Sequence, residues 1–228
     1  AAADTVEDVL GDDKNLLGLV NNAGIAVAGP LMYIEPERIR HQFEVNVLGV
    51  LTVTQAFLPL LGACEDAPEP PGRIVNISSV SGHTAYPFLG PYSASKYALE
   101  ALSDSLRREL LLFGVDVVTI VAGAVATPMW EKVEQQDIED YSKTAYGDAV
   151  SRMVEITAQV GQQGMPAAKV SRTVRRALED QRPRSRYVLA NNWFAGWILP
   201  RWVPARWWDR IIDKQLGLSS SIEVDNDQ

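Results

Sequence analysis

The sequence predicts an α/β fold, a doubly wound Rossmann-like parallel sheet, and three observations support it. Short apolar runs at 16–20, 73–77 and 115–121 are typical of strands buried on both faces. Longer stretches with helical apolar periodicity separate them, the alternation that builds parallel sheets through right-handed crossovers. Polar and small residues follow the strands, at the edge where ligands bind in open sheets.

Composition narrows the function classes. The 228 residues suffice for one domain, 1–228, and 46% hydrophobic with 22% charged residues is typical of a soluble globular protein. A net charge of −8 and a pI of about 4.8 argue against a nucleic-acid partner. The single Cys64 excludes an internal disulfide and favours a reducing, cytoplasmic compartment. His41 and His83 lack ligand-like spacing, so we expect no metal site. No signal peptide or membrane-spanning run is visible.

The strongest chemical pattern lies between residues 73 and 97. Tyr92 and Lys96 are four residues apart on a predicted helix, hence one turn apart on one face, and Ser79 lies on the loop beyond the strand. A nearby ammonium lowers the pKa of a phenol, so Tyr92 could exchange a proton with an alcohol or carbonyl oxygen that Ser79 hydrogen-bonds. No side chain accepts hydride, which implies a cofactor. Alone, a Tyr-x-x-x-Lys pair is more often a chance helical spacing.

Several motifs together resemble the short-chain dehydrogenase/reductase family. They are LVNNAG at 19–24, FEVNVLG at 43–49, ISSVSG at 77–82 and Tyr92-x-x-x-Lys96. The resemblance implies that Tyr92 is the acid/base, Lys96 tunes it and holds a ribose, Ser79 orients the substrate oxygen, and Asn46 relays protons through a water. It also implies NAD or NADP as cofactor.

The same resemblance implies two cofactor-contacting loops. In the first, Asn22, Ala23 and Gly24 lie along the dinucleotide; a simple Asn-Gly turn is the alternative. In the second, AGAVATPMW, the backbone of Val125 and the side chain of Thr127 bind the nicotinamide carboxamide, although the family usually has Pro-Gly where this chain has Ala-Gly. Thr127 could also cap a helix ahead of Pro128.

The start of the chain departs from the family pattern. Residues 1–13 resemble the later part of an amphipathic helix, and no glycine-rich phosphate loop precedes the strand at 16–20. The segment GIAVAG at 24–29 does not have the glycine spacing of such a phosphate loop. We therefore expect a sheet truncated at its N-terminal side, and the alternative to an enzyme is an inactive binding or scaffold protein. The residue that usually selects NAD or NADP falls in the missing part.

Two long helices, 36–62 and 92–113, are candidates for homo-oligomer contacts. The first has an apolar face that includes Asn46, and it is followed by an acidic, proline-rich surface loop at 62–72. A helix at 167–180 and a last strand at 186–190 complete the predicted sheet region.

Residues 129–165 match the family's substrate lid, and 191–217 form a tryptophan-rich C-terminal segment. This segment contains Trp193, Phe194, Trp197, Ile198, Trp202, Trp207 and Trp208. Three interpretations stay open: a cover over a lipophilic pocket, a peripheral membrane contact, or packing against the domain or a second subunit. With Met129 and Trp130 at the lid entrance, the sequence favours a lipophilic secondary alcohol or ketone, as in retinol- and hydroxysteroid-type reductases.

Overall fold

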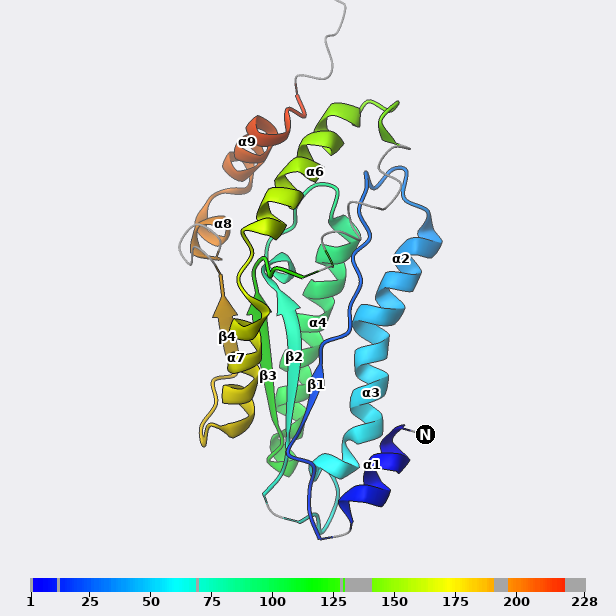
Figure 1. Ribbon diagram of the computed structural model, residues 1–228, viewed down its shortest axis with the longest axis vertical. Helices are drawn as coiled ribbons and strands as arrows, with labels where there is room; N and C mark the ends of the chain where they lie inside the picture. Colours follow the sequence, from blue (N-terminus) through cyan, green and yellow to red (C-terminus); the bar gives the residue numbers. More distant parts are fainter. Residues whose placement is uncertain are drawn as a thin grey trace, which may run out of the picture.

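The computed structural model describes residues 2–11, 13–68, 70–127, 129, 141–190 and 197–219. Four parallel strands form one sheet in the order β1-β2-β3-β4 (Figure 1). They are β1 (Gly18–Asn21), β2 (Arg73–Ser79), β3 (Asp116–Ala122) and β4 (Arg186–Leu189). The register aligns Val75 with Val20 on one side and Val118 on the other. The predicted α/β fold with a parallel sheet is confirmed.

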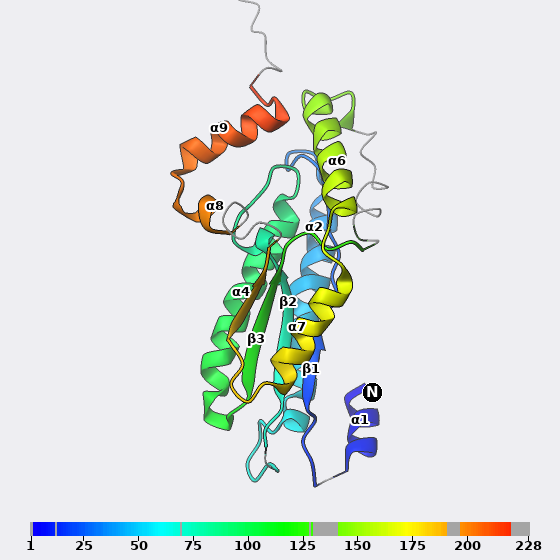
Figure 2. The ribbon, with the colours of Figure 1, turned by 60° about the vertical axis from the view of Figure 1, so that its left-hand side comes forward.

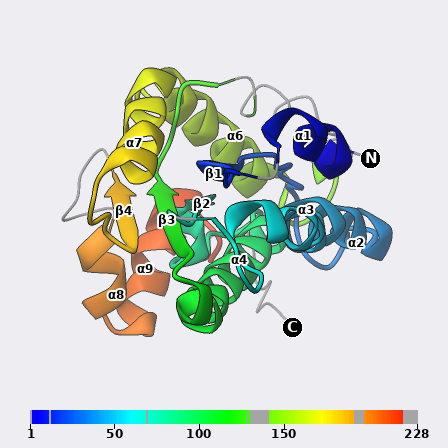
Figure 3. The same ribbon diagram turned by 90° about the horizontal axis from the view of Figure 1, so that it is seen from below.

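Helices cover both faces of the sheet (Figure 3). On one face lie α2 (Pro36–Phe43), α3 (Gly49–Phe57) and α4 (Gly90–Glu109), and on the other lies α7 (Ala167–Glu179). Alternation along the strands divides the core accordingly. Ile74 and its neighbour Val117 join the apolar cluster on the α3–α4 side, and Val75 and Val118 pack with α7.

Three predicted boundaries were wrong. Strand β2 extends to Ser79, which pairs with Ala122, so the serine ends the strand and does not lie on the loop beyond it. Strand β1 begins at Gly18, because the Leu16 amide bonds the Leu60 carbonyl outside the sheet. The helix expected over 36–62 is divided by a π-helical turn, Glu44–Leu48, and α3 ends before Pro59, which starts a short 3-10 turn.

The C-terminal part lies beyond the carboxyl ends of the strands (Figures 1 and 2). Helix α6 (Gly147–Gln162) forms part of the predicted lid, and α8 (Leu199–Trp202) and α9 (Ala205–Leu216) form most of the tryptophan-rich segment. One apolar cluster joins α6, α9 and the loop around Phe88. Trp130, Trp193 and Phe194 lie outside the described residues. Within the described ranges, no helix is long and apolar enough to cross a membrane.

Shorter elements complete the chain. Helix α1 (Ala2–Leu10) has no buried residue. Single 3-10 turns follow β2 and α4, at Val80–Gly82 and Leu110–Phe113. The turn after β2 connects Ser79 to the loop that leads into α4, so it determines where that serine lies relative to the helix.

Candidate active site

Helix α4 presents Tyr92 and Lys96 on its buried side, one turn apart as the spacing predicted. The Lys96 Nζ donates a hydrogen bond to the Ile77 carbonyl at 2.9 Å, so the ammonium lies against the end of β2. The same Nζ is 5.9 Å from the centre of the Tyr92 ring. Both polar groups therefore meet at the carboxyl edge of the sheet.

Ser79 completes this group from the last position of β2. It is buried, and its hydroxyl is close enough to the Tyr92 phenol to act on the pKa of that group. The same oxygen accepts the Ser81 amide at 3.1 Å, which caps the 3-10 turn behind it. The structure thus brings together the phenol, the ammonium and the hydroxyl that the sequence predicted to converge.

The electrostatics differ from the prediction. Burial raises the pKa of Tyr92, and the Ser79 hydroxyl only partly offsets this rise. Burial also lowers the pKa of Lys96 to about 8, and Glu100 acts in the opposite direction. The expected lowering of the phenol pKa by Lys96 is absent, because desolvation dominates and the ammonium hydrogen-bonds the Ile77 carbonyl.

Asn46 lies fully buried in the π-helical turn between α2 and α3. Its Oδ1 accepts the Ile25 amide at 2.9 Å, and its Nδ2 donates to the Ile25 carbonyl at 2.9 Å and to Ser95 Oγ at 3.0 Å. These bonds hold the loop after β1 against α4. π-Helical turns are frequent at functional sites. The proton-relay role of Asn46 stays a prediction.

Sequence reasoning missed the rest of this buried network. Gln42 is also fully buried; its Oε1 accepts the Val27 amide, and its Nε2 reaches Ser95 Oγ at 3.4 Å. The Ser95 hydroxyl in turn donates to the Tyr92 carbonyl at 2.8 Å. The only available signal was that Gln42 and Asn46 are four residues apart on one helical face.

The predicted cofactor loops lie at the same edge of the sheet. Asn22 and Ala23 are exposed after β1, and a Cβ added to Gly24 would lie 3.3 Å from Asn46 Oδ1 and 3.8 Å from Lys96 Nζ. After β3, Val125 bridges to Met165 and Thr127 is exposed. The loops after β1, β2 and β3 thus all leave the carboxyl edge of the one sheet.

No cluster of metal-ligating side chains occurs among the residues that the structure describes. Of the two histidines, His41 is exposed. His83 lies 3.3 Å from a Glu100 carboxylate oxygen, in an ion-pair cluster beside α4.

A parallel α/β sheet with Tyr, Lys and Ser at its carboxyl edge is typical of a class of dinucleotide-dependent oxidoreductases. Comparisons with known proteins agree with this class. The sequence profile described as short chain dehydrogenase matches residues 1–138. The NADPH-dependent 3-dehydrocapnine reductase of Ornithobacterium rhinotracheale is 37% identical over 94% of this chain and 75% of its own length. The mitochondrial D-beta-hydroxybutyrate dehydrogenase of Bos taurus is 34% identical over 82% of this chain.

A solved structure supports the same assignment. A short-chain dehydrogenase from Streptomyces avermitilis aligns with a TM-score of 0.63 and 25% identity, over 96% of this chain and 74% of that one. The chain belongs to the short chain dehydrogenase family. It spans three quarters of the capnine-related reductase and about half, 56%, of the hydroxybutyrate dehydrogenase.

Proposed function

We propose that this chain acts as an NAD(P)-dependent oxidoreductase that interconverts a secondary alcohol and a ketone, with Tyr92 as the acid/base. The convergence of Tyr92, Lys96 and Ser79 at the carboxyl edge of β2 is the observation that carries the proposal. The name of the NADPH-dependent relative supports the cofactor class.

The residues around the site are suited to a dinucleotide. The loop at 22–24 passes beside Lys96, with Asn22 and Ala23 exposed, and Gly24 lets its backbone pack closely on Asn46. Asn22, Ala23 and Gly24 would hold the adenosine side, Lys96 the ribose, and Val125 and Thr127 the carboxamide. When bound, the dinucleotide supplies or accepts the hydride.

The chain's own residues would handle the proton. In the reducing direction, the Tyr92 hydroxyl donates its proton to the carbonyl oxygen while hydride reaches the carbonyl carbon, so an alcohol and a phenolate result. The Ser79 hydroxyl donates a hydrogen bond to the same oxygen and holds it in reach of the phenol. Because burial and not the ammonium of Lys96 dominates the pKa of Tyr92, the part that we assign to Lys96 is its contact with the ribose. A raised pKa keeps Tyr92 protonated and ready to act as the acid.

Tyr92→Phe in the full chain tests this mechanism. We expect turnover with NADH or NADPH to fall by about 100-fold or more, because proton transfer by a positioned side chain contributes that much. Dinucleotide affinity, measured by fluorescence titration, should stay nearly unchanged. Tyr97→Phe, an exposed tyrosine on the same helix, is the control. Full activity in Tyr92→Phe would refute the role, and dinucleotide binding without turnover by the wild type would favour the binding-protein alternative.

We also propose a lipophilic substrate. Ala26, Ala28 and Leu89 form a buried cluster with the Tyr92 ring, and Met153 of α6 packs against it. This apolar surrounding favours a substrate with hydrocarbon next to the reacting carbon. A panel of steroid, acyl-chain and short hydroxy-acid substrates decides the point. Preference for D-beta-hydroxybutyrate, the short hydroxy acid in the name of one relative, would refute it.

A peripheral membrane contact through α8 and α9 is a further proposal about partners. Trp202 and Trp207 are 81% and 65% exposed, and the basic Arg206 and Arg210 flank Trp207. In a chain of net charge −8, this basic aromatic surface suits an anionic lipid headgroup layer. Flotation should recover the chain with anionic vesicles and less of Trp207→Ala; equal recovery would contradict it.

We propose a homo-oligomer as well. Leu48 and Val53, within 36–62, and Tyr97, within 92–113, are large apolar side chains left exposed. Light scattering should report more than one copy, and Val53→Glu should reduce the mass. A monomeric wild type would contradict the proposal. The cytoplasmic location expected from the single Cys64 stays a prediction.

A further inference from the structure

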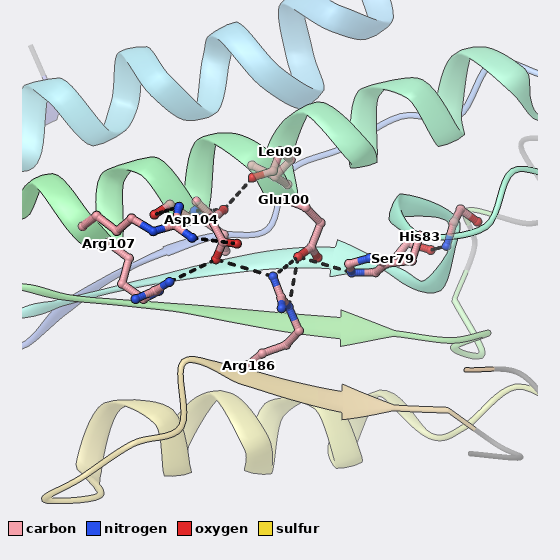
Figure 4. Close-up of polar contacts among 11 residues, drawn as sticks. Ser79, His83, Leu99, Glu100, Asp104, Arg107 and Arg186 are labelled. Atoms are coloured by element: carbon pink, nitrogen blue, oxygen red, sulfur yellow. Dashed lines mark hydrogen bonds and ion pairs between the residues drawn. The ribbon is translucent and has the colours of Figure 1, made fainter. Parts of the chain in front are cut away.

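A cluster of charged side chains lies on the side of α4 that faces β4 (Figure 4). At its centre is Glu100, one helical turn after Lys96, with a side chain only 7% exposed. One carboxylate oxygen, Oε2, accepts hydrogen bonds from Arg186 Nε at 3.1 Å and Nη2 at 2.8 Å. The same oxygen lies 3.3 Å from His83 Nε2. The mechanism proposed above does not use these groups.

We propose that Glu100 is a positioning residue of the active site, which holds the turn after Ser79 against α4 through His83 and sets the charge beside Lys96. This inference rests on the proposed function, since it concerns how the same site is kept in a productive arrangement. It contains two separable parts, a tether and a charge.

The tether follows from the packing of the 3-10 turn at Val80–Gly82. A Cβ added to Gly82 would lie 3.0 Å from the Lys96 carbonyl oxygen and 3.2 Å from Glu100 Cγ, so the turn lies directly on α4 between these residues. Ser79 begins the turn by accepting the Ser81 amide, and His83 ends it. The turn begins at Ser79, and α4 contains Tyr92. The His83–Glu100 contact therefore holds the turn, and with it Ser79, against α4.

Packing also restricts His83. Its ring lies edge-on to the buried Trp197, with the ring centroids 4.6 Å apart and the planes at 82°. The imidazole is thus held between the C-terminal segment and Glu100. A ring confined on both sides is suited to fixing a turn.

The charge follows from the groups around the carboxylate. Burial acts to raise the pKa of Glu100, but the polar groups of His83 and Ser78 and the charge of Arg186 lower it overall, so the carboxylate is ionised at neutral pH. The other charged neighbours on α4 are Lys96 and Asp104, and Asp104 itself lies 3.6 Å from Arg186. Glu100 is thus the anion that counteracts the effect of burial on Lys96.

Three variants of the full chain separate these parts. Glu100→Gln removes the charge and keeps the shape, and His83→Ala removes the tether but leaves the Glu100–Arg186 pair. Glu109→Gln is the matched control, because Glu109 is an exposed carboxylate on the same helix. The readouts are the pH profile of kcat for ketone reduction and amide hydrogen exchange of the peptide that covers 78–88.

We expect the alkaline limb of kcat to move to lower pH by about 0.5 to 1 unit in Glu100→Gln, because Lys96 loses the anion that favours its charged form. His83→Ala should leave that limb in place and lower kcat at all pH values. His83→Ala should exchange amides faster than wild type over 78–88, and Glu109→Gln should change neither readout.

A uniform loss of kcat in Glu100→Gln, with the limb unmoved, would refute the charge part and leave a merely structural residue. Unchanged exchange in His83→Ala would refute the tether, and this variant decides that part should Glu100→Gln fail to fold. Exchange needs no turnover, so the tether is judged even if Tyr92→Phe stays fully active and the proposed function itself fails.

Discussion

The two polar sides of α4 are built from different chemistry. Toward α2 and the π-helical turn, Gln42, Asn46 and Ser95 form a buried network of neutral amides and a hydroxyl. Toward β4, Glu100 and Arg186 form an ionised pair. Hydrogen bonds between neutral groups fix the positions of side chains but have little effect on the pKa values of other groups. A buried charge, in contrast, acts on the pKa of every titratable group nearby. The comparison teaches that the neutral side positions the loop at 22–28, whereas the ionised side favours the charged form of Lys96.

The two sides also differ in how water can compensate for a lost partner. The neutral network is closed to solvent, because Gln42 and Asn46 are fully buried. The ionised side reaches the surface, since the Arg186 side chain is 31% exposed. Truncating a side chain on the neutral side should therefore lower the free energy of unfolding by more than the absence of charge there suggests.

The largest expected effect on stability is that of Asn46→Ala. The substitution leaves the Ile25 amide, the Ile25 carbonyl and the Ser95 hydroxyl short of a partner in a dry site. We expect a loss of about 3 kcal/mol or more in the free energy of unfolding, measured with denaturant. Asn22→Ala, at an exposed asparagine, should change it by less than about 0.5 kcal/mol. Equal losses in the two variants would show that the network contributes little.

Local patterns predicted much of the fold and the core of the site. The apolar run at 73–77 fell within β2 and the run at 115–121 overlapped all but the last residue of β3, because a buried parallel strand leaves a continuous apolar run. Tyr92 and Lys96 were correctly placed one turn apart, because helical periodicity determines that geometry.

What the sequence did not predict depends on contacts between distant segments. Glu100 and Arg186 are 86 residues apart, and nothing near either one marks the other as its partner. The division of the 36–62 helix at a π-helical turn depends on where Asn46 meets the loop after β1. The raised pKa of Tyr92 depends on burial by remote residues, so spacing to Lys96 alone gave the wrong direction.

The ionised side is tested by Arg186→Met, which removes the two hydrogen bonds that Arg186 donates to Oε2 of the buried Glu100 carboxylate. We expect a loss of about 2 kcal/mol at neutral pH, below the usual range for a fully buried pair because water can reach the site. Arg108→Met removes a largely exposed arginine near Asp104 and should cost less than about 0.5 kcal/mol. Thermal and denaturant unfolding measure both. A cost of Arg186→Met above that of Asn46→Ala would reverse the ranking of the two sides.

An effect of about the same size as that of Arg186→Met appears as a pH dependence of stability at Lys96, which lies between the two sides. Its pKa falls from the usual 10.5 to about 8 in the folded chain. Between these values the unfolded chain binds the proton that the folded chain has lost, so the free energy of unfolding rises with pH; below about 8 both states bind it and the penalty is fully present. From pH 7.5 to 9.5, wild type should gain about 2 kcal/mol relative to Lys96→Met. Lys169→Met, at an exposed lysine on α7, should run parallel to wild type over this range. If the free energy of unfolding of Lys96→Met has the same pH dependence as that of wild type, burial does not penalise the charged form of Lys96. Groups besides Glu100 would then balance its charge.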